Sequence, residues 1–146
     1  MVGSAVGSAV GSTVGSIRHH VRIHRTAAEV WALVGDPARL HEWFPGIVAC
    51  AVDGTTRVIT TGTGMPMPEE ILVNDPGQRR FQYRITAPVF QFHRGTIDVI
   101  DLDDGTCLVV YQTDADPRTM ALVIAGGAAG ALRELHRQME PVGAKG

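Results

Sequence analysis

Long apolar runs, aromatic residues and cysteines are all scarce in this sequence. Of its 146 residues 45% are hydrophobic, but only 5% are aromatic, and the cysteines are Cys50 and Cys107 alone. The most apolar window, Met120 to Leu132, is rich in glycine and shorter than the ~20 apolar residues that a transmembrane helix needs. Because neither cysteine has a Cys or His neighbour at metal-ligand spacing, we expect free thiols and no metal site.

An excess of charge of either sign is also absent. The formal net charge is −2, with 13 Lys and Arg residues against 15 Asp and Glu residues. A chain balanced in this way lacks the basic character of nucleic-acid-binding proteins, so we expect no nucleic-acid partner. The N-terminus does not show the charged start and long apolar run of a secretion signal. We therefore expect a cytoplasmic protein, either a monomer or a homodimer, with no transmembrane segment.

A four-residue Val-Gly-Ser repeat occupies the N-terminus from Val2 to Ile17. Its Gly and Ser content is typical of a flexible tail. We interpret residues 1–13 as this tail, residues 14–142 as a single domain and residues 143–146 as a C-terminal tail. The alternative is that the last unit of the repeat, Val14 to Ile17, forms the start of the first strand.

Alternation of apolar and polar residues predicts most of the elements. A first strand is expected from Ile17 to Arg25. Thr26 and Glu29 form a capping box for a short helix, and Asp36 with Pro37 starts a second one. Period-two alternation between turn signals then predicts strands at Ile47 to Asp53, Arg57 to Thr61, Glu69 to Asn74, Arg79 to Thr86, Phe90 to Leu102, and Thr106 to Asp114.

A last helix is expected to start with Asp116 as its cap and to run to about Glu140. Its apolar stripe would consist of Met120, Ile124, Ala128, Ala131, Leu135 and Met139. Short links between the strands imply an antiparallel meander, which must curve around this helix to cover it. Such a curved sheet leaves an apolar space suited to a small molecule. Gly126, Gly127 and Gly130 either thin the helix beside a ligand or partner, or allow close packing on the sheet.

Three stretches and the closing helix resemble a known family. The stretches are VRIHRTAAEVWALVGDPARLHEWFPGI, DPGQRRFQYRI and GTIDVIDLDDGTCLVVYQ. They resemble the START-like (SRPBCC) superfamily, and within it the polyketide cyclase/dehydrase and lipid-transport group, from Ile17 to Glu140. The resemblance implies an α+β helix-grip fold: a curved, seven-stranded antiparallel sheet around a long C-terminal helix, with two short helices after the first strand.

Strand parity indicates which side chains face the expected cavity. Glu69 and Tyr83 fall on inward faces, and either His93 or Arg94 does so if a bulge near Arg94 and Gly95 reconciles the two apolar sets of that strand. The candidate catalytic residues are therefore Glu69, Tyr83 and Arg94. The candidate ligand-binding residues are Trp43, Phe44, Met65, Met67, Phe92, His93, Tyr111 and Ile124. Trp31 is expected to hold the first short helix to the sheet.

Three hypotheses about function stay open. The first is binding of a hydrophobic small molecule, such as a lipid, a polyketide or an aromatic compound, in the cavity. The second is a cofactor-independent aromatase/cyclase or dehydratase, in which Arg94 polarises a ketone and Glu69, His93 or Tyr83 moves a proton. The third is binding of a macromolecular partner, with a vestigial cavity. Because the sequence has no phosphate loop, metal-ligand set or nucleophile with its base, we expect no cofactor.

Overall fold

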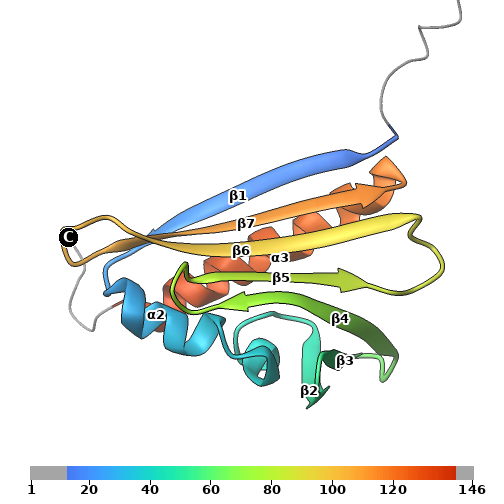
Figure 1. Ribbon diagram of the computed structural model, residues 1–146, viewed down its shortest axis with the longest axis horizontal. Coiled ribbons are helices and arrows are strands. Elements are labelled where there is room, and N and C mark those ends of the chain that lie inside the picture. Colours follow the sequence, from blue (N-terminus) through green and yellow to red (C-terminus); the bar gives the residue numbers. More distant parts are fainter. Residues whose placement is uncertain (1–12, 141–146) are drawn as a thin grey trace, which may run out of the picture.

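The computed structural model of the chain describes residues 13–140. Seven strands form an antiparallel sheet in the order β1-β7-β6-β5-β4-β3-β2 (Figure 1). The strands are β1 (Gly15–Ile23), β2 (Ile47–Asp53), β3 (Thr56–Thr61), β4 (Pro66–Asp75), β5 (Arg80–Ile85), β6 (Phe92–Asp101) and β7 (Cys107–Asp116). The helices are α2 (Ala27–Val34), the 3-10 helix η2 (Pro37–Glu42) and α3 (Arg118–Met139). The element order and the α+β helix-grip architecture predicted from the sequence are confirmed.

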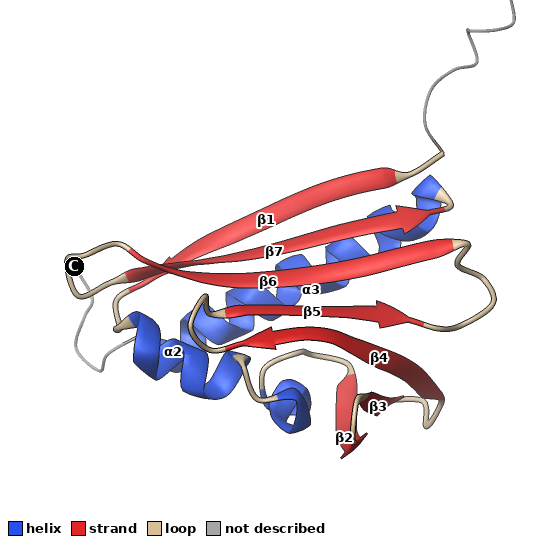
Figure 2. Cartoon of the chain, viewed as in Figure 1, coloured by secondary structure: helices blue, strands red, loops and turns tan. Residues whose placement is uncertain are grey.

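The long helix α3 crosses behind the long strands in Figure 2 and contacts β1 and β7. Alanines make most of its buried face, so the helix axis comes close to the sheet. The buried residues are Ala121, Ala125, Ala128, Ala131, Leu132 and Leu135. Met120, Ile124 and Met139 of the predicted stripe are only half-buried. Among the described residues, no helix combines the length and apolar character needed to cross a membrane.

The end of the N-terminal repeat belongs to the sheet. Strand β1 begins at Gly15, and Gly15 and Ser16 pair with Ala115 and Asp114 of β7. This agrees with the second of the two interpretations of that segment. The predicted tails lie outside the described residues, apart from Thr13, whose hydroxyl donates to Asp116 at 2.8 Å.

The capping residues of the two short helices are as predicted. Thr26 accepts from the backbone of Glu29, whose side chain in turn accepts from the backbone of Thr26. Asp36 accepts from the Ala38 amide at 3.0 Å. The predicted cap of α3 is wrong, because Asp116 is still paired in β7 and the residue at the helix start is Pro117, which makes no side-chain cap.

The predicted bulge near Arg94 and Gly95 is also wrong. Strand β6 pairs with β7 without a register shift from Phe92 to Asp101, so His93, Gly95 and Ile97 all face the interior. The shifts lie elsewhere, in β2 between Ile47 and Ala49 and in β4 between Ile71 and Val73. The apolar residues of β6 do not share one face: Phe92 lies on the outer face, whereas Ile97 and Val99 are buried on the inner face.

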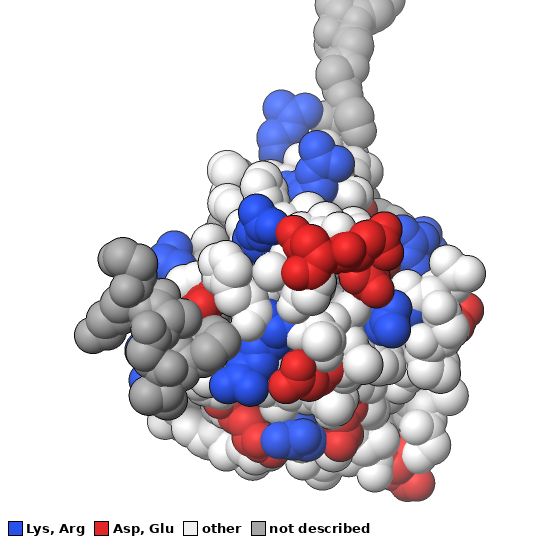
Figure 3. Space-filling model, turned by 90° about the vertical axis from the view of Figure 1, so that its left-hand side faces the viewer, with Lys and Arg blue, Asp and Glu red and all other residues white. Residues whose placement is uncertain are grey.

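Charged side chains of both signs are interspersed on the face drawn in Figure 3, over the end of the molecule near α2. Several of them form exposed pairs, such as Arg22 with Asp104 at 2.6 Å. Exposed pairs of this kind each contribute at most about 1 kcal/mol to stability. The basic side chains on this face are not gathered into a single patch.

The glycines of α3 have different surroundings. A Cβ atom at Gly127 would lie 3.3 Å from the ring of Phe44, so this glycine permits a close approach. A Cβ atom at Gly126 would meet no heavy atom within 4 Å. Of these two glycines, only Gly127 has a packing reason for its small size.

Replacing Gly126 by alanine is expected to raise the free energy of unfolding by about 0.5–1 kcal/mol, because alanine is the better helix former and the added methyl group meets open space. Urea denaturation followed by circular dichroism would measure the change. The reverse substitution on the same helix, Ala129→Gly, should lower the stability by a similar amount. A Gly126→Ala variant less stable than the original chain would contradict this account.

Candidate functional site

An apolar pocket lies between α3, the segment that follows η2, and the inner face of β3, β4 and β5. Its volume is about 180 Å³. Its apolar walls include Phe44, Ile47, Met67, Ile85 and Ile124. Glu69 and Tyr83 are the ionisable residues among those that line it. The pocket is therefore an apolar space with polar groups concentrated on the side of β4 and β5.

Glu69 is held there by a buried ion pair with Arg57. Arg57 and Glu69 are opposite each other in the β3–β4 register, and their exposed fractions are 2% and 3%. Nε of Arg57 lies 2.8 Å and Nη2 lies 2.7 Å from the same carboxylate oxygen, Oε1 of Glu69. Nη1 donates to the carbonyl of Pro37 at 3.2 Å. The guanidinium carbon is 5.0 Å from the ring centroid of Tyr83.

The second carboxylate oxygen of Glu69, Oε2, has no hydrogen-bond partner within residues 13–140. Both contacts from Arg57 go to Oε1. Burial raises the pKa of the Glu69 carboxyl, although the neighbouring guanidinium acts in the opposite direction. A carboxylate with one free oxygen beside an apolar pocket can accept a hydrogen bond or a proton from a bound molecule.

Two tyrosines extend this polar side of the interior. The hydroxyls of Tyr83 and Tyr111 lie 2.5 Å apart, and both side chains are buried. Burial raises the pKa of both phenols above its usual range, so both are neutral. The Tyr83 ring lies across Gly95, where a Cβ atom would come within 2.8 Å of the phenol oxygen. Gly95 therefore gives Tyr83 the space to reach Tyr111.

His93 faces the interior and is neutral. Its Nδ1 accepts from the Ile85 amide at 2.9 Å, which places the ring proton on Nε2. Burial lowers the pKa of His93 from 6.5 to about 4. The ring lies 5.5 Å from that of Tyr83 and 5.2 Å from that of Phe90. No hydrogen-bond acceptor for Nε2 is present in the described part of the chain.

The structure brings together most of the residues singled out from the sequence. Phe44, Met67, Glu69, Tyr83 and Ile124 line the pocket. Trp43 and Tyr111 are buried behind it, with ring centroids 6.2 Å apart, and do not line it themselves. Trp31 is half-buried with its ring against Gly35.

Three of the expected residues lie elsewhere. Arg94 is exposed on the outer face of β6, because His93 takes the inward position of that strand. Phe92 is on the same outer face and is 40% exposed. Met65, in the turn before β4, is 63% exposed. The interior cation is Arg57, which parity within β3 could have revealed, since Arg57 and Ile59 share a face.

His93 should make the protein less stable in mild acid. Its pKa is lower in the folded chain than in the unfolded one, so the unfolded chain binds more protons between pH 6.5 and about 4. The free energy of unfolding should therefore fall as the pH is lowered through this range, by up to about 3 kcal/mol from His93. Urea denaturation at several pH values would measure this slope, which should be smaller in His93→Gln. An NMR titration in which His93 protonates near pH 6.5 would contradict it.

Three solved structures with the same fold show how the chain compares with known proteins. A protein from Thermobifida fusca is 30% identical, over 86% of this chain and 95% of its own, with a TM-score of 0.69. Norcoclaurine synthase from Thalictrum flavum, in complex with dopamine and hydroxybenzaldehyde, is 16% identical over 94% of this chain and 93% of its own, with a TM-score of 0.68. The di-domain ARO/CYC protein BexL from the BE-7585A biosynthetic pathway is 19% identical over 84% of this chain and 45% of its own, with a TM-score of 0.71.

The two enzymes are too distant in sequence to show more than the fold. No curated protein matches the sequence. Residues 15–140, which include nearly all of the described chain, match the family described as polyketide cyclase / dehydrase and lipid transport. The chain therefore belongs to the polyketide cyclase/dehydrase and lipid-transport family.

Proposed function

We propose that this protein binds a small hydrophobic molecule, about the size of a single ring and carrying a hydrogen-bond donor, in the pocket beneath α3. The observation that carries the proposal is the combination of apolar walls with the free carboxylate oxygen of Glu69. The walls favour an apolar body, and Oε2 favours a hydroxyl or ammonium group at one position on it. A molecule with both features would satisfy the only free acceptor of this buried ion pair.

The volume of the pocket favours a small ligand. An engineered apolar cavity of about 150 Å³ binds benzene, whereas pockets for drug-sized molecules span about 300–1,000 Å³. The pocket here, at about 180 Å³, is close to the first of these. A long acyl chain or a multi-ring polyketide would require α3 or the segment after η2 to move. The single-ring compounds bound to norcoclaurine synthase are in the size range that we propose.

Filling the pocket should abolish binding. The fluorescence of Trp43 in a Trp31→Phe background should change on titration with 4-methylphenol, because Trp43 packs against the pocket residue Phe44. In this background, Ile124→Phe should weaken binding about tenfold or more, a loss of ~1.4 kcal/mol. The matched control Leu122→Phe changes an exposed residue of the same helix and should bind normally. Equal affinities of the two variants would contradict the proposal.

A second candidate function is proton transfer at a carbon next to a carbonyl, the chemistry that cyclisation and dehydration share. The raised pKa of Glu69 and its free oxygen favour a role as general base. The hydroxyl pair of Tyr83 and Tyr111 could donate a hydrogen bond to the carbonyl oxygen of a substrate. Arg94 is outside the pocket, so this version of the hypothesis does not include it. No cofactor takes part in this scheme.

The second candidate can be tested by exchange of substrate protons with solvent. Phenylacetone in D₂O should lose the protons next to its carbonyl faster in the presence of the protein, as measured by NMR. Glu69→Gln should reduce this rate by about 10²- to 10⁴-fold. Because Glu69→Gln leaves Arg57 buried without its counter-charge, Glu69→Asp serves as the second variant: it keeps the charge and withdraws the carboxylate from the pocket. Unchanged exchange in a folded Glu69→Asp protein would exclude the role.

A further inference from the structure

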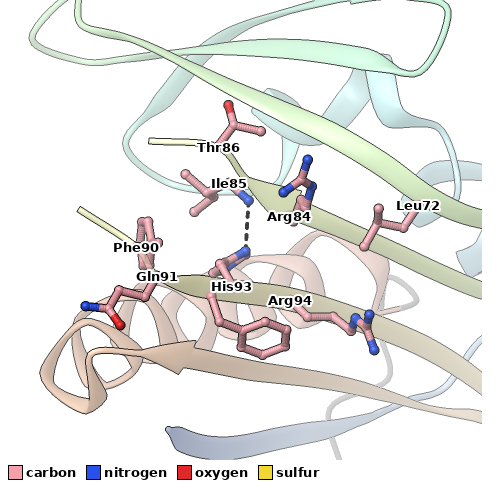
Figure 4. A pocket seen from close by; sticks show the side chains of 9 residues that line it. Leu72, Arg84, Ile85, Thr86, Phe90, Gln91, His93 and Arg94 are labelled. Carbon is pink, nitrogen blue, oxygen red and sulfur yellow. Dashed lines mark hydrogen bonds between the residues drawn. The ribbon is translucent and has the colours of Figure 1, made fainter. Parts of the chain in front are cut away.

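The sheet is split between β5 and β6 at one end. The ladder between these strands runs from the pair Arg80 and Asp98 to the pair Tyr83 and Gly95, where it stops. Beyond it, β5 stays paired with β4, and β6 stays paired with β7. The ring of His93 lies in the gap and accepts the Ile85 amide proton, as Figure 4 shows. A side chain thus replaces the backbone bond that a continuous ladder would make.

A groove of about 430 Å³ follows this split. It is larger than the apolar pocket and shares only Ile85 with it. Its lining includes the polar side chains of Arg84, Arg94, His93 and Gln91 and the apolar side chain of Leu72 (Figure 4). Phe92 lines it as well. Since Arg84, Arg94 and Leu72 are exposed, the groove opens on the face of the sheet opposite α3.

The charges around the groove are incompletely neutralised. Arg84 lies opposite Glu70 in the β4–β5 register, and Arg84 and Arg94 line the groove from β5 and β6 respectively. Arg84 is paired with Glu70 at 2.6 Å. Arg94 forms no ion pair with a described carboxylate, although Asp114 lies opposite it in the β6–β7 register, and its guanidinium carbon lies 5.8 Å from the ring centroid of Phe92. The guanidinium of Arg94 is therefore available to an anion bound in the groove.

A neutral donor at the groove is also left without an acceptor. The Nε2–H group of His93, a residue that is only 4% exposed, has no acceptor. Gln91 also lines the groove and is exposed, so its side-chain amide is open to a ligand there. A buried donor without an acceptor costs about 1–3 kcal/mol. An oxygen atom of a bound molecule would supply the missing acceptor.

We propose that this groove is a second binding site, and that it takes a small organic anion, a carboxylate or a phosphate monoester with an apolar portion. The anionic oxygens face Arg94, His93 and Gln91, and the apolar portion lies on Phe92 and Leu72. Guanidinium groups are the preferred partners of both carboxylate and phosphate. The site is separate from the pocket beneath α3 and does not depend on the function proposed for that pocket.

NMR titration of the ¹⁵N-labelled protein with hexanoate and with hexyl phosphate tests this site and tells the two anion classes apart. Binding of either should shift the signals of Ile85 and Gln91. Arg94→Gln should weaken binding about tenfold or more, the effect of losing one charge-assisted hydrogen bond. The matched control Arg18→Gln removes an exposed arginine from β1 and should leave the affinity unchanged.

Three results would each overturn the proposal. The first is that the neutral analogue hexanamide binds as tightly as hexanoate. The second is that Arg94→Gln binds the anions as tightly as the original chain, and the third is that neither anion shifts the signal of Ile85. Ile124→Phe, which fills the apolar pocket, should leave anion binding intact. Loss of both kinds of binding in that variant would show that the two sites are one, and would also overturn the proposal.

Discussion

The buried ion pair between Arg57 and Glu69 constrains the whole interior. Charges that are nearly inaccessible to solvent must stay paired, and removing one partner of such a pair costs about 3–5 kcal/mol. The contact requires Arg57 of β3 and Glu69 of β4 to stay opposite each other, which fixes the register of these strands. The bond from Nη1 to the Pro37 carbonyl also attaches the start of η2 to β3. One side chain, that of Arg57, therefore contacts both η2 and β4.

The geometry of this pair also decides the chemistry that the pocket can offer. A symmetric, two-oxygen contact would have used both acceptors of Glu69. Here Nε and Nη2 of Arg57 both approach Oε1, and Oε2 is left beside the apolar walls. Tyr83 lines the same pocket, and Gly95 leaves room for its ring. The polar groups of the interior are therefore concentrated on β4 and β5, opposite the apolar side formed by Phe44 and Ile124.

The sequence predicted local features well and pairings between distant strands poorly. The capping box at Thr26 and the bounds of β2 depend on neighbouring residues, and both agree with the structure. Arg57 was missed because arginines are mostly exposed unless paired, and its partner is on another strand. Arg94 was misplaced because β6 has large apolar residues on both faces, so parity alone does not give its direction. The pocket volume could not be predicted, since it depends on how Trp43, Phe44 and Tyr111 pack together.

With the split between β5 and β6, the two faces of the sheet would favour different classes of ligand. Continuous pairing would have sealed the sheet, and His93 would then have needed another acceptor or donor for Nδ1. His93 is neutral because burial lowers its pKa to about 4, its Nδ1 accepts from the Ile85 amide where the two strands separate, and the groove lies beside Arg94, which forms no ion pair with a described carboxylate. The inner pocket has a free carboxylate oxygen, which favours ligands with donors. The outer groove has a free guanidinium, which favours ligands with negative charge. A molecule suited to one site is therefore electrostatically unsuited to the other, so the two sites would select different ligands although Ile85 forms part of both.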